Sequence, residues 1–139
     1  VTSLNAEGTK VEQALRAGQG ATTMVADGAG RVVVADTRGG ELLVYGVDPL
    51  ILRQRYPVPD SPYGLAAAGS PTGLVWVTQT AINMVVGYDL ATGIPVEKVR
   101  YRTVQQPNLL VFDDASGTLY VVSGAGAGVQ VITAAGVGR

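Results

Sequence analysis

Short runs of β-branched and aromatic residues, each opened by a glycine, recur along this chain between polar turns. Three of them align without gaps, at Gly30–Thr37, Gly73–Thr80 and Gly117–Gly124. A second run follows each of these, at Val44–Asp48, Val85–Asp89 and Val129–Thr133, and a further example opens the chain at Val1–Asn5. The spacing is about 43 residues, which predicts a repeated supersecondary unit rather than one irregular domain.

Each unit reads as four strands, called A to D here in chain order. Strand A is a stretch of small and apolar residues, at Thr22–Ala26, Gly64–Ala68 and Leu109–Asp113. Strand B is the glycine-led run, and strand C is the run that follows it. Strand D, at Leu52–Val58 and Val96–Val104, alternates apolar and charged residues and is expected to be half exposed. This gradient from buried to exposed strands, with a period of roughly 40–45 residues, is typical of β-propeller blades.

The segment Val11–Ala17 stands where a strand D belongs, after Asn5, the counterpart of Asp48. Its glutamate, glutamine, alanine, leucine and arginine residues all favour a helix. Its place in the repeat favours a strand, which is the prediction adopted, and one or two helical turns are the alternative.

The strand count predicts an all-β fold: a partial β-propeller of about three four-stranded antiparallel blades, from a ring of six or seven. The whole of 1–139 is one propeller segment, with a blade remnant at 1–18 and blades at 20–58, 62–104 and 107–133. The last unit lacks a strand D, because 134–139 is too short and too rich in glycine. The remaining blades are therefore the first expected partner, supplied by the same parent chain or by another copy.

Composition excludes several classes of function. The 139 residues are 47% hydrophobic and 15% charged, with a net charge of −1, so there is no basic excess for nucleic acid. Histidine and cysteine are absent, which removes Ser-His-Asp and Cys-His catalysis, thiolate and imidazole metal sites, and disulfides. No apolar run approaches the roughly 18 residues that span a bilayer. The sequence predicts no catalytic residue, metal site or cofactor.

The strand B and strand C runs resemble the YVTN and NHL classes of propeller repeat. Three longer runs, at Ala35–Pro49, Gly87–Val96 and Thr103–Asn108, resemble the C-terminal part of the LppL family of mycobacterial lipoproteins. That resemblance implies an extracytoplasmic, cell-envelope protein held to the membrane by a lipid anchor on the parent chain. It implies no activity.

Most acidic residues are expected to form turns. Asp113 and Asp114 stand in a hairpin, and the position of Asp48 and Asp89 is filled elsewhere by Asn5 and Thr133, as suits a repeated cap. Asn108 begins a strand A near the channel, without carboxylate or amide partners at the equivalent positions.

Two features are candidates for binding. Asp36 and Arg38, in a B–C loop, are expected at a propeller rim, where they could meet a protein partner or pair with each other. A basic flank is expected on the strands D, where each set of charges shares one face; its members are Arg53, Arg55, Lys98, Arg100 and Arg102. These charges either keep the outer strands soluble or face anionic lipid headgroups.

The function predicted is a non-catalytic binding or scaffolding module of an extracytoplasmic lipoprotein. The first alternative is a propeller enzyme of hydrolase or dehydrogenase type, whose channel site draws its catalytic residues from the missing blades. A purely structural spacer is the second alternative.

Overall fold

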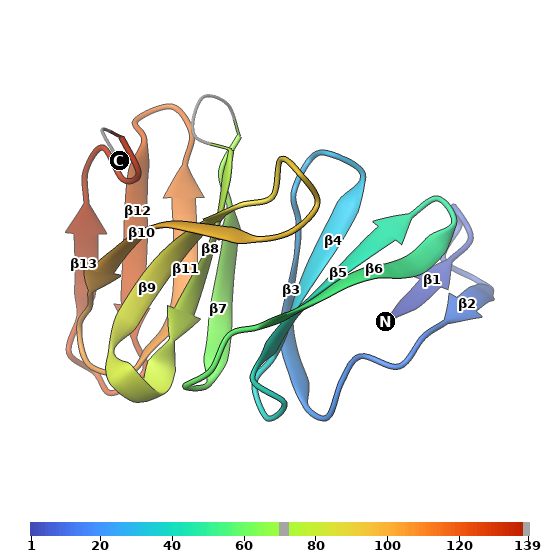
Figure 1. Cartoon of the computed structure of the whole chain (residues 1–139), viewed down its shortest axis with the longest axis horizontal. Helices are drawn as coiled ribbons and strands as arrows, with labels where there is room; N and C mark the ends of the chain where they lie inside the picture. Colours follow the sequence, from blue (N-terminus) through green and yellow to red (C-terminus); the bar gives the residue numbers. More distant parts are fainter. Residues whose placement is uncertain (70–72, 138–139) are drawn as a thin grey trace.

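The computed structural model describes residues 1–69 and 73–137, and in these residues four antiparallel sheets stand side by side (Figure 1). The first sheet is a hairpin of β1 (Thr2–Leu4) and β2 (Val11–Ala14). The second comprises β3 (Ala21–Ala26), β4 (Arg31–Asp36), β5 (Glu41–Val47) and β6 (Leu50–Pro57). The third comprises β7 (Pro62–Ala67), β8 (Leu74–Gln79), β9 (Met84–Asp89) and β10 (Val96–Arg102). The fourth comprises β11 (Pro107–Asp113), β12 (Thr118–Ser123) and β13 (Val129–Ile132).

Strands follow one another in space as they do in sequence, in the orders β3-β4-β5-β6, β7-β8-β9-β10 and β11-β12-β13. Each sheet lies inside one of the four ranges that the repeat delimits. The fourth sheet has strands A, B and C, and its glycine-rich tail forms turns as far as residue 137. The last two residues of that tail, 138–139, lie outside the described part of the chain.

The segment with helical composition is extended. β2 pairs with β1 in antiparallel register, with Thr2 opposite Ala14 and Leu4 opposite Val11. The ladder hydrogen bonds of this hairpin outweigh the helix propensity of Glu12 and Gln13, so the strand prediction is confirmed. A short 3-10 turn, Thr80–Ile82, joins β8 to β9.

The core lies between successive sheets rather than within any one of them. In strand β4, Val33 and Ala35 face the next sheet and pack with Val75 and Val77, whereas Val34 faces the β1–β2 side. All of these side chains are buried, and each apolar side chain taken from water contributes roughly 1.5–3 kcal/mol. Alternation along a single strand therefore joins three consecutive sheets.

The two outermost faces of the described chain are open. On the far face of the fourth sheet the side chains of Leu109, Val111, Val129 and Val131 are 53–58% exposed. At the opposite end of the chain Met24 is 61% exposed. The strand C positions of the second and third sheets that match Val129 and Val131, which include Leu42, Val44 and Val85, are no more than 1% exposed. The same repeat position is thus buried wherever another sheet follows it.

No helix in the described residues is long and apolar enough to cross a membrane.

Candidate functional site

Asp36, at the end of β4, is buried and holds the linker that precedes strand A. Its carboxylate accepts hydrogen bonds from the backbone N–H groups of Gln19, Gly20 and Gly39, at 3.0, 2.8 and 3.0 Å. Its exposed fraction is 1%. The side chain therefore has no surface to offer a partner and does not pair with Arg38. Of the two predicted rim contacts, only Arg38 remains available.

The charge of Asp36 is stabilised by these contacts. Burial alone raises the pKa of its carboxyl, but the N–H groups of Gln19, Gly39 and Gly20 and the positive charge of Arg55 lower it. The net pKa lies below the ordinary value for aspartate. Asp36 is an ionised structural anchor at neutral pH.

A polar residue performs a related task at the same place in each repeat. In the third sheet the side-chain amide of Gln79 donates to the carbonyl oxygen of Pro59, at 3.0 Å. In the fourth sheet the hydroxyl of Ser123 donates to the carbonyl oxygen of Gln105, at 2.5 Å. The end of each strand B is thereby tied to the linker before its own strand A. A signal for this role was present in the sequence, because polar residues recur in register at the end of a valine-rich run.

The next residue along reaches forward to the following sheet. The hydroxyl of Thr37 donates to the carbonyl oxygen of Pro62, and that of Thr80 donates to the carbonyl oxygen of Pro107, both at 2.6 Å. The fourth sheet has Gly124 at this position, which has no hydroxyl. We call the bonds of Thr37 and Thr80 the hydroxyl latches.

Arg38 borders a cavity of about 490 Å³ at this end of the sheets, called here the rim pocket. Besides Arg38, its walls are Gly20, Ala21, Thr22, Thr37 and Ser61. The hydroxyls of Thr22 and Thr37 lie 2.6 Å apart. An exposed guanidinium suits a polar or negatively charged ligand. The Thr22 and Thr37 hydroxyls are engaged with each other and with Pro62, so Arg38 is the main group that faces such a ligand. Sequence analysis found Arg38 but missed Thr22 and Ser61, because nothing local showed that these segments meet.

The backbone beside the rim pocket is strained. Asp60 and Ser61 are consecutive non-glycine residues with φ of 65° and 60°, the left-handed region that such residues rarely adopt. Hydrogen bonds from the N–H groups of Thr80 and Ala81 to the carbonyl oxygens of Ser61 and Asp60 hold this conformation. Strain of this kind gathers at binding sites, where surrounding structure fixes it.

Asp89 and Asp113 form turns, as predicted, and so does Asn5. Asp89 caps the N–H of Ala91, and Asn5 caps the N–H groups of Thr9 and Lys10. Asp113 accepts from the Ser116 hydroxyl and the Ala115 N–H, and these bonds lower its pKa. Asp114 has a role that was not foreseen, because its carboxylate accepts from the N–H of Gly69 in the neighbouring sheet, at 2.7 Å.

Among residues 1–69 and 73–137, no three acidic side chains gather closely enough to hold a metal ion. The side-chain amide of Asn108 lies against Gly124, where a Cβ would come within 2.5 Å of its nitrogen. Asn108 therefore packs on its own sheet.

The predicted basic flank is not one continuous stripe. Arg55 pairs with Glu41 at 2.9 Å, and Arg100 pairs with Glu97 at 2.5 Å. Lys98 and Arg102 are exposed on β10, as expected. A register shift between Glu97 and Val99 leaves Lys98 without a partner residue on β9, so the predicted alternation of Lys98 with Arg100 and Arg102 does not hold there.

The two arginines of β6 do not share a face, contrary to the sequence prediction. A β-bulge between Val44 and Tyr45 shifts the register there, so that Arg55 pairs with Leu43 while Arg53 lies over Gly46 on the opposite face. Alternation fails where a strand contains an extra residue.

Comparisons with known proteins bear on the fold. No protein-family model and no curated protein sequence matches the chain. Among solved structures, a streptogramin B lyase matches 95% of this chain and 44% of its own, with a TM-score of 0.73 and 16% identity. A catalytically inactive variant of virginiamycin B lyase from Staphylococcus aureus, determined with quinupristin, matches 95% of this chain and 47% of its own (TM-score 0.66, 14% identity). Hydrazine synthase from Kuenenia stuttgartiensis matches 91% of this chain and 35% of its own (TM-score 0.66, 18% identity).

These likenesses establish architecture. The chain is an all-β, partial β-propeller, as the repeat predicts, and it spans less than half the length of each of these neighbours. At 14–18% identity the likeness carries no activity across.

Proposed function

We propose that this chain is a non-catalytic binding module whose partner docks at the rim pocket, with Arg38 as the main polar contact. The observation that carries the proposal is the difference in exposure between two neighbouring residues at the rim. Asp36 is buried in backbone hydrogen bonds, whereas Arg38 is exposed beside the hydroxyls of Thr22, Thr37 and Ser61. The partner expected is a protein segment that presents a carboxylate, because guanidinium groups bind carboxylates with paired, directional bonds.

Further propeller blades are the proposed first partners. The described chain lacks a strand D at its fourth sheet and strands A and B at its first. Further blades, on the same parent chain or on another copy, would supply both. Because 95% of this 139-residue chain aligns with 44% of the streptogramin B lyase, the lyase chain has about 300 residues. That is the length of about seven 43-residue units. This length supports a ring of about seven blades, of which this chain makes nearly half.

The resemblance to the LppL lipoproteins supports placing this module outside the cytoplasmic membrane, on a parent chain with a lipid anchor. Lys98 and Arg102, exposed on β10, are then free to lie near anionic headgroups. Such a position would hold the rim pocket close to the envelope surface.

An enzyme remains the second candidate, because the matched solved structures include two lyases and a synthase. The virginiamycin B lyase is catalytically inactive when one histidine is replaced by alanine, and the present chain contains no histidine. A comparable group would have to come from blades outside this chain.

The test compares proteins that co-purify with the natural-length protein and with its Arg38→Gln variant, by quantitative mass spectrometry. Arg102→Gln is the matched control, since it removes the same charge from an exposed site on β10. We expect one or a few partners to be lost with Arg38→Gln and retained with Arg102→Gln. Identical partner sets for all three proteins would overturn the rim proposal. Turnover of quinupristin by the natural-length protein would favour the enzyme instead.

A further inference from the structure

The outer edge of the fourth sheet is open in the part of the chain that the structure describes. β13 pairs with β12 on one side, and no strand within residues 1–69 or 73–137 pairs with its other side (Figure 1). The chain does not return along this edge after β13. It turns instead toward the third sheet, where the N–H of Gly136 donates to the phenol oxygen of Tyr101, at 3.1 Å. The backbone of β13 can therefore pair with a further strand.

The composition of β13 differs from that of the strands at the outer edges of the other sheets. β2, β6 and β10 each carry exposed charges, which include Glu12, Arg55 and Lys98. Charged residues and prolines on an edge strand discourage pairing with other chains. β13 has neither, and its side chains Val129 and Val131 are 58% and 55% exposed. Its residues are those of an inner strand, which has a neighbour on both sides.

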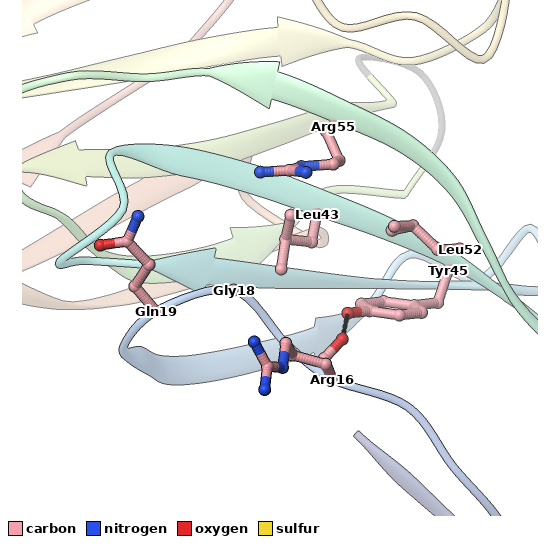
Figure 2. A pocket seen from close by; sticks show the side chains of 7 residues that line it. All are labelled: Arg16, Gly18, Gln19, Leu43, Tyr45, Leu52 and Arg55. Carbon is pink, nitrogen blue, oxygen red and sulfur yellow. Dashed lines mark hydrogen bonds between the residues drawn. The ribbon is translucent and has the colours of Figure 1, made fainter.

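β13 is held in place from the side of the third sheet. The side-chain amide of Gln130 accepts from the N–H of Val104, at 2.9 Å, and donates to the carbonyl oxygen of Arg102, at 3.0 Å. A similar bond fixes β5 in the second sheet, where the phenol of Tyr45 donates to the carbonyl oxygen of Arg16, at 2.8 Å (Figure 2). The open edge of β13 is therefore preformed, which lowers the entropic cost of adding a strand.

Strand D carries a tyrosine at one fixed place in the repeat. Tyr56 lies opposite Leu42 in the second sheet, and Tyr101 lies opposite Val85 in the third. The ladders with strand B give Val129 the same position in β13. Leu42 and Val85 are 0% exposed, whereas Val129 is 58% exposed. Val129 is therefore the position on which an aromatic side chain of a further strand would lie.

Such a ring would also have an aromatic neighbour on strand B. In the third sheet Tyr101 stacks with Trp76, with ring centroids 6.0 Å apart. The aligned strand B runs give Tyr120 the position of Trp76, and Tyr120 is half-buried on the open face. A tyrosine opposite Val129 would thus lie near Tyr120 as Tyr101 lies near Trp76, and aromatic pairs of this kind stabilise an interface.

An arginine precedes the tyrosine in both strands D, and an acid neutralises each arginine. Arg55 of β6 lies above β5 in the view of Figure 2 and binds Glu41, at the start of β5, at 2.9 Å. Arg100 binds Glu97, three residues earlier on its own strand, at 2.5 Å. In the fourth sheet Gly128 precedes strand C at the position of Glu41. A strand beside β13 therefore has to bring its own acid, as β10 does.

From these registers we propose that β13 binds an extended segment of the pattern Glu-x-x-Arg-Tyr, which pairs with it in antiparallel register and places the tyrosine opposite Val129. The segment comes from the parent chain outside residues 1–139, so the inference rests on the further blades proposed above and not on the rim pocket. A second copy of this chain does not offer the segment, because its β10 is already paired with β9 in its own sheet.

The first test adds an acetylated and amidated peptide of the sequence Val96–Val104 to the 139-residue chain. We expect saturable one-to-one binding by calorimetry, with amide shifts and slower amide hydrogen exchange at β13. Tyr101→Ser in the peptide should weaken binding about tenfold, since it removes the ring that lies on Val129. Val129→Ser in the chain should also weaken it. Val111→Ser is the matched control on the same open face, two strands away, and should leave affinity unchanged.

Strand addition has a second signature in the peptide backbone. Alternate N–H groups of a strand point to opposite edges, so only one set of them bonds to β13. One peptide is N-methylated at Arg100 and Arg102, and another at Tyr101 and Thr103. One of the two should lose binding and the other should keep it, and urea unfolding checks that the variant chains remain folded.

Four outcomes of these measurements would overturn the proposal. They are the absence of saturable binding, equal binding of the two N-methylated peptides, full binding of the Tyr101→Ser peptide, and amide shifts at β9 instead of β13. None of them involves Arg38, so the result is independent of the co-purification test of the rim pocket.

The natural-length protein tests the source of the segment. A photo-cross-linking amino acid placed at position 129 should join to a tyrosine-containing segment of the same polypeptide, identified by mass spectrometry. The same amino acid at position 111 is the control and should join to a different segment. A product with another protein, a product with a second copy, or no product within the polypeptide would overturn the proposal.

Discussion

The carboxylate of Asp36 occupies the space that a Cβ on Gly18 would need, with an approach of only 1.9 Å between that Cβ and Oδ2. Gly18 also has a φ of +68°, where side chains are strained. Both facts follow from the tight wrap of the linker around the buried aspartate. The buried carboxylate of Asp36 therefore requires a glycine at position 18.

Gly18→Ala should therefore destabilise the chain by about 3 kcal/mol, as the sum of backbone strain and a clash that the buried carboxylate cannot relieve. Gly28→Ala is the matched control, because Gly28 has a φ of +78° and open space around its Cβ position. It should cost only about 1 kcal/mol. Equal losses in urea unfolding would show that the contact with Asp36 contributes nothing.

Acid should weaken the fold through Asp36. Its pKa is depressed in the folded chain, so its contribution to stability is present above the unfolded value of about 3.9 and is lost as pH falls through the folded pKa. Asp36→Asn should be less stable at neutral pH and should show a smaller further loss on acidification. Urea unfolding of both proteins at a series of pH values measures the difference. Parallel pH profiles would contradict the assignment.

The hydroxyl latches should each contribute about 1 kcal/mol, the usual net value of a hydrogen bond between neutral groups. Thr37→Val and Thr80→Val keep the shape of the side chain and remove the bonds to Pro62 and Pro107. Thr2→Val, at an exposed position of β1, is the control and should change the unfolding free energy little. If all three variants unfold alike, the bonds do not join the sheets.

The open face of the fourth sheet should tolerate charge. Val111→Lys should change the free energy of unfolding by less than about 0.5 kcal/mol, because the Val111 side chain is 53% exposed. Val121→Lys, at a position with 0% exposure, should prevent folding. In the natural-length protein, Val111→Lys should also become destabilising if another blade covers this face. Circular dichroism during urea unfolding gives all three comparisons.

The fold could be predicted from sequence because the repeat sets strand positions and alternation sets their faces. Even β2, whose composition favours a helix, was identified from its place in the repeat. The prediction failed at Arg53 and at Lys98, where a bulge adds one residue to β6 and to β10 and interrupts the alternation. Such a register shift depends on pairing across strands and leaves no mark within the strand itself.

The site was harder to predict, since it depends on contacts between distant segments. Asp36 looked like an exposed loop residue, because only the structure shows Gln19 and Gly20 returning to its carboxylate. Tyr45 and Arg16 are 29 residues apart, and no local pattern joins them.

Because of Gly124, the fourth sheet lacks a bond that the second and third sheets make to the sheet that follows them. Thr37 and Thr80 bind the following sheet through a hydroxyl, whereas Gly124 offers no hydroxyl at that position. A joint that lacks this directional bond should separate at lower cost than the joints on either side of β7. In a closed ring, this seam is where the circle would first come apart, and where a separately folded arc could most readily be fitted.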